Sequence, residues 1–163
     1  MTSQPIDYEK HFLVETSWEI CNQLGGIYTV IRSKLPANIE AWGKNYCLLG
    51  PLVNKGLNAE FEDIAEREST LGRTVAALEN MGIEVRYGTW LVSGRPKTVL
   101  LNPDHNIGKL QHIKKQLWED HQIPIGTDDS LYDISLQWCD LVDTFFTLFS
   151  KHEKRTILFH GHE

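Results

Sequence analysis

The sequence predicts an α/β domain with an open sheet, because short apolar runs of strand length alternate with longer segments of helical periodicity. The first run, residues 11–15, is followed by a glycine pair at 25–26 and then by a helix. The last run, residues 156–159, leads directly into the HGHE motif at 160–163. Ligands of open α/β sheets bind beyond the carboxyl ends of the strands, so we expect both motifs at the ligand-binding edge.

The remaining elements follow from periodicity and from turn signals. A helix begins at the glycine pair, and Pro36 is expected to end it or to open a new turn through residues 38–42. Gly82 is a natural stop for the second helix, and the turn at 93–96 joins two strands into a hairpin. The predicted strands are 11–15, 45–49, 84–92, 97–101 and 156–159, and the later helices are 71–81, 107–120 and 131–150. We expect the last strand to be buried and the last helix to be buried on more than one side.

Composition limits the function classes. The chain has 163 residues, of which 41% are hydrophobic, so it is long enough for one domain with a core. A formal net charge of −6 argues against nucleic-acid binding as the main function, since such proteins usually carry a basic face. No apolar run approaches the ~20 residues of a membrane helix, and the three separated cysteines are typical of reduced thiols. We therefore expect a cytoplasmic protein.

The glycine pair at 25–26 allows two interpretations. Without a Cβ, backbone amides can approach a ligand closely, and the start of a helix favours an anion such as a phosphate. A tight turn with close packing of helix on sheet would need the same glycines. The spacing matches neither the GxGxxG of a dinucleotide fold nor the GK[ST] ending of a P-loop.

The HGHE motif allows three interpretations. His160 and His162 could bind a metal, but they would need a third ligand from elsewhere, and HExxH is absent, so we expect no metal. They could also be ordinary hydrogen-bonded groups at the end of a strand. The third interpretation places imidazoles and the Glu163 carboxylate in a ligand cleft, where they would bind sugar hydroxyls or assist proton transfer.

At this point the residues indicate a family. Five blocks, in order along the chain, resemble the glycogen synthases of animals and fungi. The blocks are ETSWEICNQLGGIYTVIRS (15–33), NYCLLGP (45–51), YGTWLVSGRPKTVLL (87–101), LWEDHQIPIG (117–126) and HGHE (160–163). The last block is similar to the start of the family's HFHEW motif.

The resemblance implies the Rossmann-like N-terminal domain of a two-domain GT-B glycosyltransferase. Residues 1–10 would be an N-terminal extension, and residues 11–163 an incomplete first domain without the C-terminal domain. The implied reaction is retaining transfer of glucose from UDP-glucose to the non-reducing end of an α-1,4-glucan, without a metal or other cofactor. Among catalytic residues, the resemblance points to Glu163 and then His162.

For substrate binding, the resemblance points to Gly25, Gly26 and His160, together with the position of Gln23. The family usually has a basic residue two positions before the glycine pair, and here that position is Gln23. A neutral amide cannot make a charge-assisted contact with a phosphate, so donor affinity would be weaker or supplied elsewhere. The chain also ends at Glu163, without the tryptophan that usually follows, so we expect it to be inactive by itself.

Two alternatives stay open. One is another GT-B glycosyltransferase, related to the starch, sucrose or trehalose enzymes, although GGIYTV and YGTWLVSG fit glycogen synthase better. The other is a non-catalytic module that binds glucan or a partner subunit. The five tryptophans could stack on sugars, but we expect most of them in the core. Self-association into a homo-oligomer is left open, because an apolar face meant for a second domain would favour it.

Overall fold

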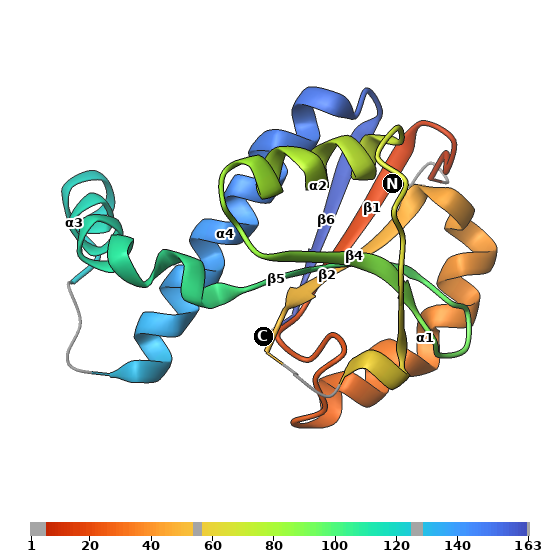
Figure 1. Cartoon of the computed structure of the whole chain (residues 1–163), viewed down its shortest axis with the longest axis horizontal. Helices are drawn as coiled ribbons and strands as arrows, with labels where there is room; N and C mark the ends of the chain where they lie inside the picture. Colours follow the sequence, from red (N-terminus) through yellow and green to blue (C-terminus); the bar gives the residue numbers. More distant parts are fainter. Residues whose placement is uncertain (1–5, 54–56, 125–128, 163) are drawn as a thin grey trace, which may run out of the picture.

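The computed structural model describes residues 6–53, 57–124 and 129–162, and these form a six-stranded sheet flanked by helices (Figure 1). The strand order is β3-β4-β5-β2-β1-β6. The strands are β1 His11–Thr16, β2 Tyr46–Pro51, β3 Phe61–Asp63, β4 Val85–Trp90, β5 Lys97–Leu101 and β6 Thr156–Gly161. β5, β2, β1 and β6 are parallel, whereas β4 pairs antiparallel with both β5 and β3. The predicted α/β open sheet is confirmed.

The strands form where the sequence predicts them. β2 is buried at every position, as expected for a parallel strand covered on both faces. β4 and β5 form the predicted hairpin, with Val85 opposite Leu101. The short strand β3 lies in the segment 52–67, for which the sequence pattern gives no prediction.

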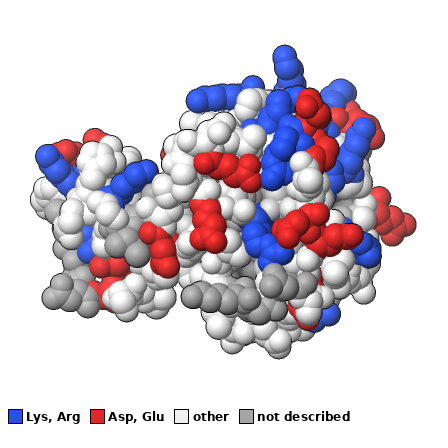
Figure 2. Space-filling view, viewed as in Figure 1, with Lys and Arg blue, Asp and Glu red and all other residues white. Residues whose placement is uncertain are grey.

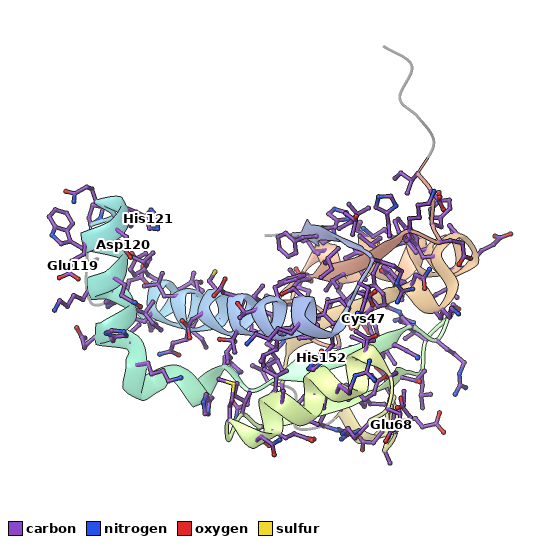
Figure 3. All side chains as sticks on the ribbon, turned by 90° about the horizontal axis from the view of Figure 1, so that it is seen from above. Cys47, Glu68, Glu119, Asp120, His121 and His152 are labelled. Carbon is purple, nitrogen blue, oxygen red and sulfur yellow. The ribbon has the colours of Figure 1, made fainter. Side chains whose placement is uncertain are left out.

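Helices cover both faces of the sheet. They are α1 Gly26–Trp42, α2 Thr70–Asn80, α3 Leu110–His121 and α4 Ser130–His152. α2 and α4 share one face, where Leu78 and Phe145 belong to the same core cluster as Val14 of β1. α1 covers the other face, where Ile31 packs with Leu48 of β2. α3 lies apart from the sheet, beside the N-terminal half of α4, and carries the labelled residues 119–121 in Figure 3.

The prediction that Pro36 ends the first helix is wrong. α1 continues through Pro36 to Trp42, and Gly43 with φ +53° follows it. Proline in a helix removes one backbone hydrogen bond, but Leu35 before it is fully buried, and Ile39 after it packs on the same cluster. Tertiary packing therefore holds the helix together across the proline.

Two predictions of burial are corrected in the last third of the chain. β6 was expected to be buried, but it is the edge strand, and 57% of Phe159 is exposed. α4 begins at Ser130, as predicted within one residue, yet 72% of Leu131 is exposed. Only its later turns, around Leu141 and Phe145, enter the core.

The predicted helix 107–120 begins at Leu110, after a 3-10 segment at Pro103–Lys109.

The cysteines and tryptophans of the described residues differ in how deeply they are buried. Cys21, Cys47 and Cys139 are free thiols, and burial raises the pKa of the Cys47 thiol to about 12. Trp90 and Trp138 are buried, Trp18 and Trp42 are partly buried against the core clusters, and 45% of Trp118 is exposed. Within the described ranges, no helix is both long and apolar enough to cross a membrane.

Candidate functional site

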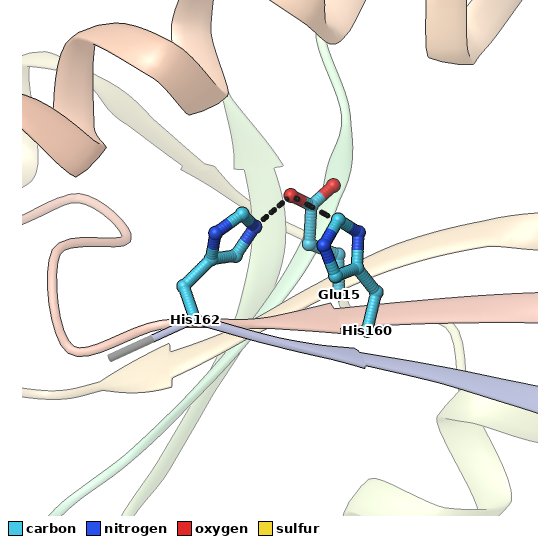
Figure 4. Close-up of side chains that lie close together, drawn as sticks. All are labelled: Glu15, His160 and His162. Carbon is cyan, nitrogen blue, oxygen red and sulfur yellow. Dashed lines mark hydrogen bonds and ion pairs between the residues drawn. The ribbon is translucent and has the colours of Figure 1, made fainter.

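Pairing of β1 with β6 builds a polar cluster at the carboxyl end of the sheet. The parallel register places Glu15 directly beside His160, and the backbone N–H of His162 donates to the carbonyl of Thr16. Two histidines at the end of one strand therefore meet a carboxylate at the end of its neighbour (Figure 4). The sequence motif gave the histidines, but only the strand pairing supplies Glu15.

Glu15 is fully buried and is held by three close donors and one more distant one. Its Oε1 accepts from Lys34 Nζ at 2.5 Å and from His162 Nε2 at 2.6 Å, and its Oε2 accepts from the Tyr46 hydroxyl at 2.5 Å. Asn38 Nδ2 lies 3.4 Å from the same Oε2. A charged side chain inside a sheet would be costly without such partners, so this network is what allows a glutamate at that position.

These contacts fix the charge state of Glu15. Burial raises its pKa, but the hydrogen bonds from Lys34, Tyr46 and His162 outweigh burial and place the pKa below its ordinary value. Burial and the charge of Glu15 raise the pKa of Tyr46, so that hydroxyl stays a donor. Glu15 is therefore a carboxylate at neutral pH, beside the Lys34 side chain.

The short contact also determines which nitrogen of His162 is free. Nε2 lies 2.6 Å from a carboxylate oxygen, so it carries the proton and donates. Nδ1 is then the ring nitrogen left to accept a hydrogen bond, for example from a hydroxyl group. His160 is more open, with half of its side chain exposed and its Nδ1 3.9 Å from Glu15. Burial and the nearby Lys34 lower the pKa of His160, which favours its neutral form.

The same three residues have the composition of a metal site. One ligand atom each of Glu15, His160 and His162 lie within 4.8 Å of one another, so the third ligand that the motif lacks is supplied by β1. However, the Lys34 ammonium lies 2.5 Å from the Glu15 carboxylate and 3.3 Å from His162 Nε2. A divalent cation would have to displace this positive charge, which makes the cluster a poor fit for a metal.

The glycine turn is exposed, and its amides already hold an anion. Glu19 Oε2 accepts from the backbone N–H of Gly25 at 2.7 Å and of Tyr28 at 3.0 Å. Glu19 therefore caps α1, which has no acidic residue in its first turn and no side-chain cap at Gly25. This arrangement supports the interpretation that the turn attracts anions. A Cβ at Gly26 would meet no atom within 4 Å, so packing within the described residues does not explain that glycine.

The hydrogen bonds from the Gly25 and Tyr28 amides to Glu19 predict a modest contribution to the free energy of unfolding. Replacing Glu19 with alanine leaves the first amides of α1 without their acceptor, so we expect Glu19→Ala to lower the free energy of unfolding by about 1 kcal/mol. Urea denaturation of both chains measures the difference. Glu40→Ala is the control, since Glu40 is an exposed carboxylate near the opposite end of α1. Equal stability of the two variants would contradict a capping role for Glu19.

Sequence reasoning missed Arg32, which offers the positive charge that Gln23 lacks. Gln23 and Arg32 line one cavity of about 350 Å³ with Tyr28 and Ser93. The Arg32 guanidinium lies 5.3 Å from the centre of the Tyr28 ring. Arg32 is one helical turn after Tyr28, so helical spacing from the glycine turn would have indicated it.

The two sequence motifs border a common cavity. Leu24, which precedes the glycine pair, and Glu19, which accepts from its Gly25 amide, line a space of about 390 Å³ together with His162 of the HGHE motif. The expectation that both motifs lie at the carboxyl edge is therefore confirmed. Glu163 lies outside the described residues, so its placement stays a prediction.

Comparison with known proteins agrees with this architecture. The family model described as glycogen synthase matches residues 15–163. A glycogen (starch) synthase of Neurospora crassa is 32% identical over 161 residues, covering 98% of this chain and 23% of that protein. The human liver glycogen (starch) synthase is 32% identical over 126 residues, covering 77% and 18%, respectively. That of Caenorhabditis elegans is 30% identical over 149 residues, covering 91% and 22%.

The chain thus spans about a fifth of the length of these curated relatives. The family match nevertheless covers the end of β1 with Glu15, the glycine turn, the β4–β5 hairpin and the HGHE motif. By this match, the chain belongs to the glycogen synthase family.

Proposed function

We propose that this chain is the first domain of a cytoplasmic enzyme that transfers glucose from UDP-glucose to the non-reducing end of an α-1,4-glucan. The observation that carries the proposal is the cluster of Glu15, Lys34 and His162 at the carboxyl end of β1 and β6. It joins an oriented imidazole to a fixed positive charge, beside a helix start that already binds a carboxylate.

Each group has a role in this proposal. The amides of the glycine turn, with Arg32 nearby, would face the phosphates of the donor, and Glu19 would move aside when they bind. Lys34 and Arg32 would supply positive charge, so no metal or other cofactor is required. His162 would hold a hydroxyl of the transferred sugar through Nδ1, and Glu163 would act next to it.

Glucose transfer by the full-length product of the gene that encodes this chain tests the proposal. Radiolabelled UDP-glucose is the donor, glycogen is the acceptor, and label in precipitated glucan is counted. We expect transfer, and we expect His162→Ala to lower kcat at least about tenfold, because an oriented imidazole at the reacting sugar is lost. We also expect Glu163→Ala to reduce turnover and the 163-residue chain alone to transfer no label.

His152→Ala is the matched control, since His152 is the last residue of α4 and precedes the start of β6, whereas His160 and His162 lie at the end of that strand. It should leave kcat unchanged. If the full-length product transfers glucose from no nucleotide donor, the catalytic proposal fails. Glucan binding without transfer would then support a non-catalytic module.

A further inference from the structure

Another cavity lies at the amino end of the sheet, at the edge opposite the cluster around Glu15. The parallel strands β5, β2, β1 and β6 all begin at this edge. Lys44 lies two residues before β2, Lys97 is the first residue of β5, and Arg155 immediately precedes β6. These side chains and the first turn of α2 line a space of about 490 Å³, within the ~300–1,000 Å³ range of small-molecule sites. We call this space the amino-edge cavity.

The amino-edge cavity is basic, although the chain as a whole has a formal net charge of −6. Four cationic and two acidic side chains line it, namely Lys44, Arg73, Lys97, Arg155, Glu9 and Glu68. Figure 2 shows Lys and Arg side chains gathered where β1 and α2 begin. A surplus of positive charge in a concave site attracts anions.

Two of the four cations are available to a ligand. Arg155 Nε donates to Glu153 Oε1 at 2.8 Å, and Arg73 Nη1 donates to a backbone carbonyl at 2.6 Å, so both guanidinium groups are engaged. By contrast, Lys44 and Lys97 form no hydrogen bond or ion pair with any other residue that the structure describes. Their ammonium groups can therefore bind an anion without breaking an existing contact.

The start of α2 adds backbone donors to the same wall. Among the described residues, the N–H groups of Thr70 and Leu71 have no acceptor, as is usual in the first turn of a helix. The neighbouring amides are taken, since Ser69 N–H donates to Glu66 Oε1 at 2.5 Å and Gly72 N–H donates to Ser69 Oγ at 3.1 Å. No acidic residue lies in the first turn of α2, so its positive end favours an anion.

A buried hydroxyl beside this wall lacks a partner. Tyr87 is 3% exposed, and its hydroxyl forms no hydrogen bond with the described residues. Burial raises the pKa of Tyr87, and the neighbouring Ser69 side chain lowers it in part. A serine hydroxyl has one hydrogen to donate and two lone pairs to accept. When Ser69 donates to a bound anion, its oxygen can accept from Tyr87, and the orphaned hydroxyl gains its partner.

We propose that the amino-edge cavity binds a phosphate group. The phosphate oxygens accept from the ammonium groups of Lys44 and Lys97 and from the amides of Thr70 and Leu71. The cavity is larger than one phosphate, so it has room for free phosphate and for a phosphomonoester with a small organic group. The site is separate from the glycine turn and from the cluster of His162. It therefore goes beyond the proposed transferase function and does not depend on it.

NMR titration of the 163-residue chain at constant ionic strength tests the site. One arm uses inorganic phosphate, and the other uses glycerol 3-phosphate. We expect the amide signals of Thr70 and Leu71 to shift until they saturate. Lys44→Gln and Lys97→Gln should each weaken binding about fivefold, because each removes a charge-assisted hydrogen bond. Tighter binding of the ester identifies a phosphomonoester as the ligand, and tighter binding of inorganic phosphate identifies the free anion.

Lys115→Gln is the matched control, since it removes an exposed lysine from α3, outside the cavity. It should leave the affinity for phosphate unchanged. No shift at Thr70 and Leu71 in either arm, or equal affinity of the wild type and both cavity variants, would overturn the inference. Shifts confined to Gly25 and Gly26 would also overturn it, because they place phosphate only at the glycine turn. Glucose transfer by the full-length product is a separate measurement, so failure of this site leaves the proposed function intact.

Discussion

Replacing Glu15 with alanine is expected to lower the free energy of unfolding by about 3–5 kcal/mol, the usual cost of removing one partner from a buried ion pair. Glu15 is fully buried, and its removal would leave Lys34, His162 and the Tyr46 hydroxyl without their carboxylate acceptor. Urea denaturation at neutral pH measures the loss. A decrease below about 1 kcal/mol would contradict the view that Glu15 organises the cluster.

Glu15→Gln provides the matched variant, because it keeps the shape and removes the charge. The pKa of Glu15 is lowered in the folded chain, so its carboxylate stabilises the fold above the unfolded value of about 4.5. That contribution is lost as pH falls through the lower, folded pKa. The wild-type chain should therefore lose stability more steeply than Glu15→Gln below pH ~4.5, and the two curves should converge in acid.

Replacing Gly88 with alanine is expected to cost about 2–4 kcal/mol, because a methyl group at this position has no room. Its Cβ would overlap the carbonyl oxygen of Glu62 and the ring of Phe61, both of which belong to the neighbouring strand β3. Phe61 is buried and cannot move without disturbing its core cluster. Thermal and urea unfolding measure the loss.

Gly26→Ala is the opposite case and serves as the control. A Cβ at Gly26 meets nothing within 4 Å, and alanine is the better residue for a helix, so this variant should be as stable as the wild type or slightly more stable. Equal losses at Gly26 and Gly88 would show that the close contact at β3 is not the cause. A stable Gly26→Ala chain would also leave ligand approach as the reason for that glycine.

Much of the fold was predictable because local patterns and tertiary packing agree. The apolar runs that became β1, β2 and β5 are buried strands, and the glycine at 82 stops α2 as its position suggests. The edge position of β6 could not be predicted from TILF, because an apolar run does not reveal which strands will pair with it. The prediction that Pro36 ends the helix failed for a related reason. The hydrogen bond that a proline removes from a helix can be read from the sequence, whereas the packing of Ile39 on the core cannot.

The candidate site, like the fold, could be predicted only in part. The sequence by itself determined the chemical groups: two histidines after a terminal strand and a glycine turn at a helix start, in blocks similar to one family. Only the tertiary structure decided what those groups can do. Strand pairing brought the buried Glu15 to His162, and packing of α1 on the sheet brought Lys34 to the same carboxylate. Glu15 lies 147 residues from His162 and 19 residues from Lys34 along the sequence. Such contacts depend on strand register and burial, which no local pattern encodes.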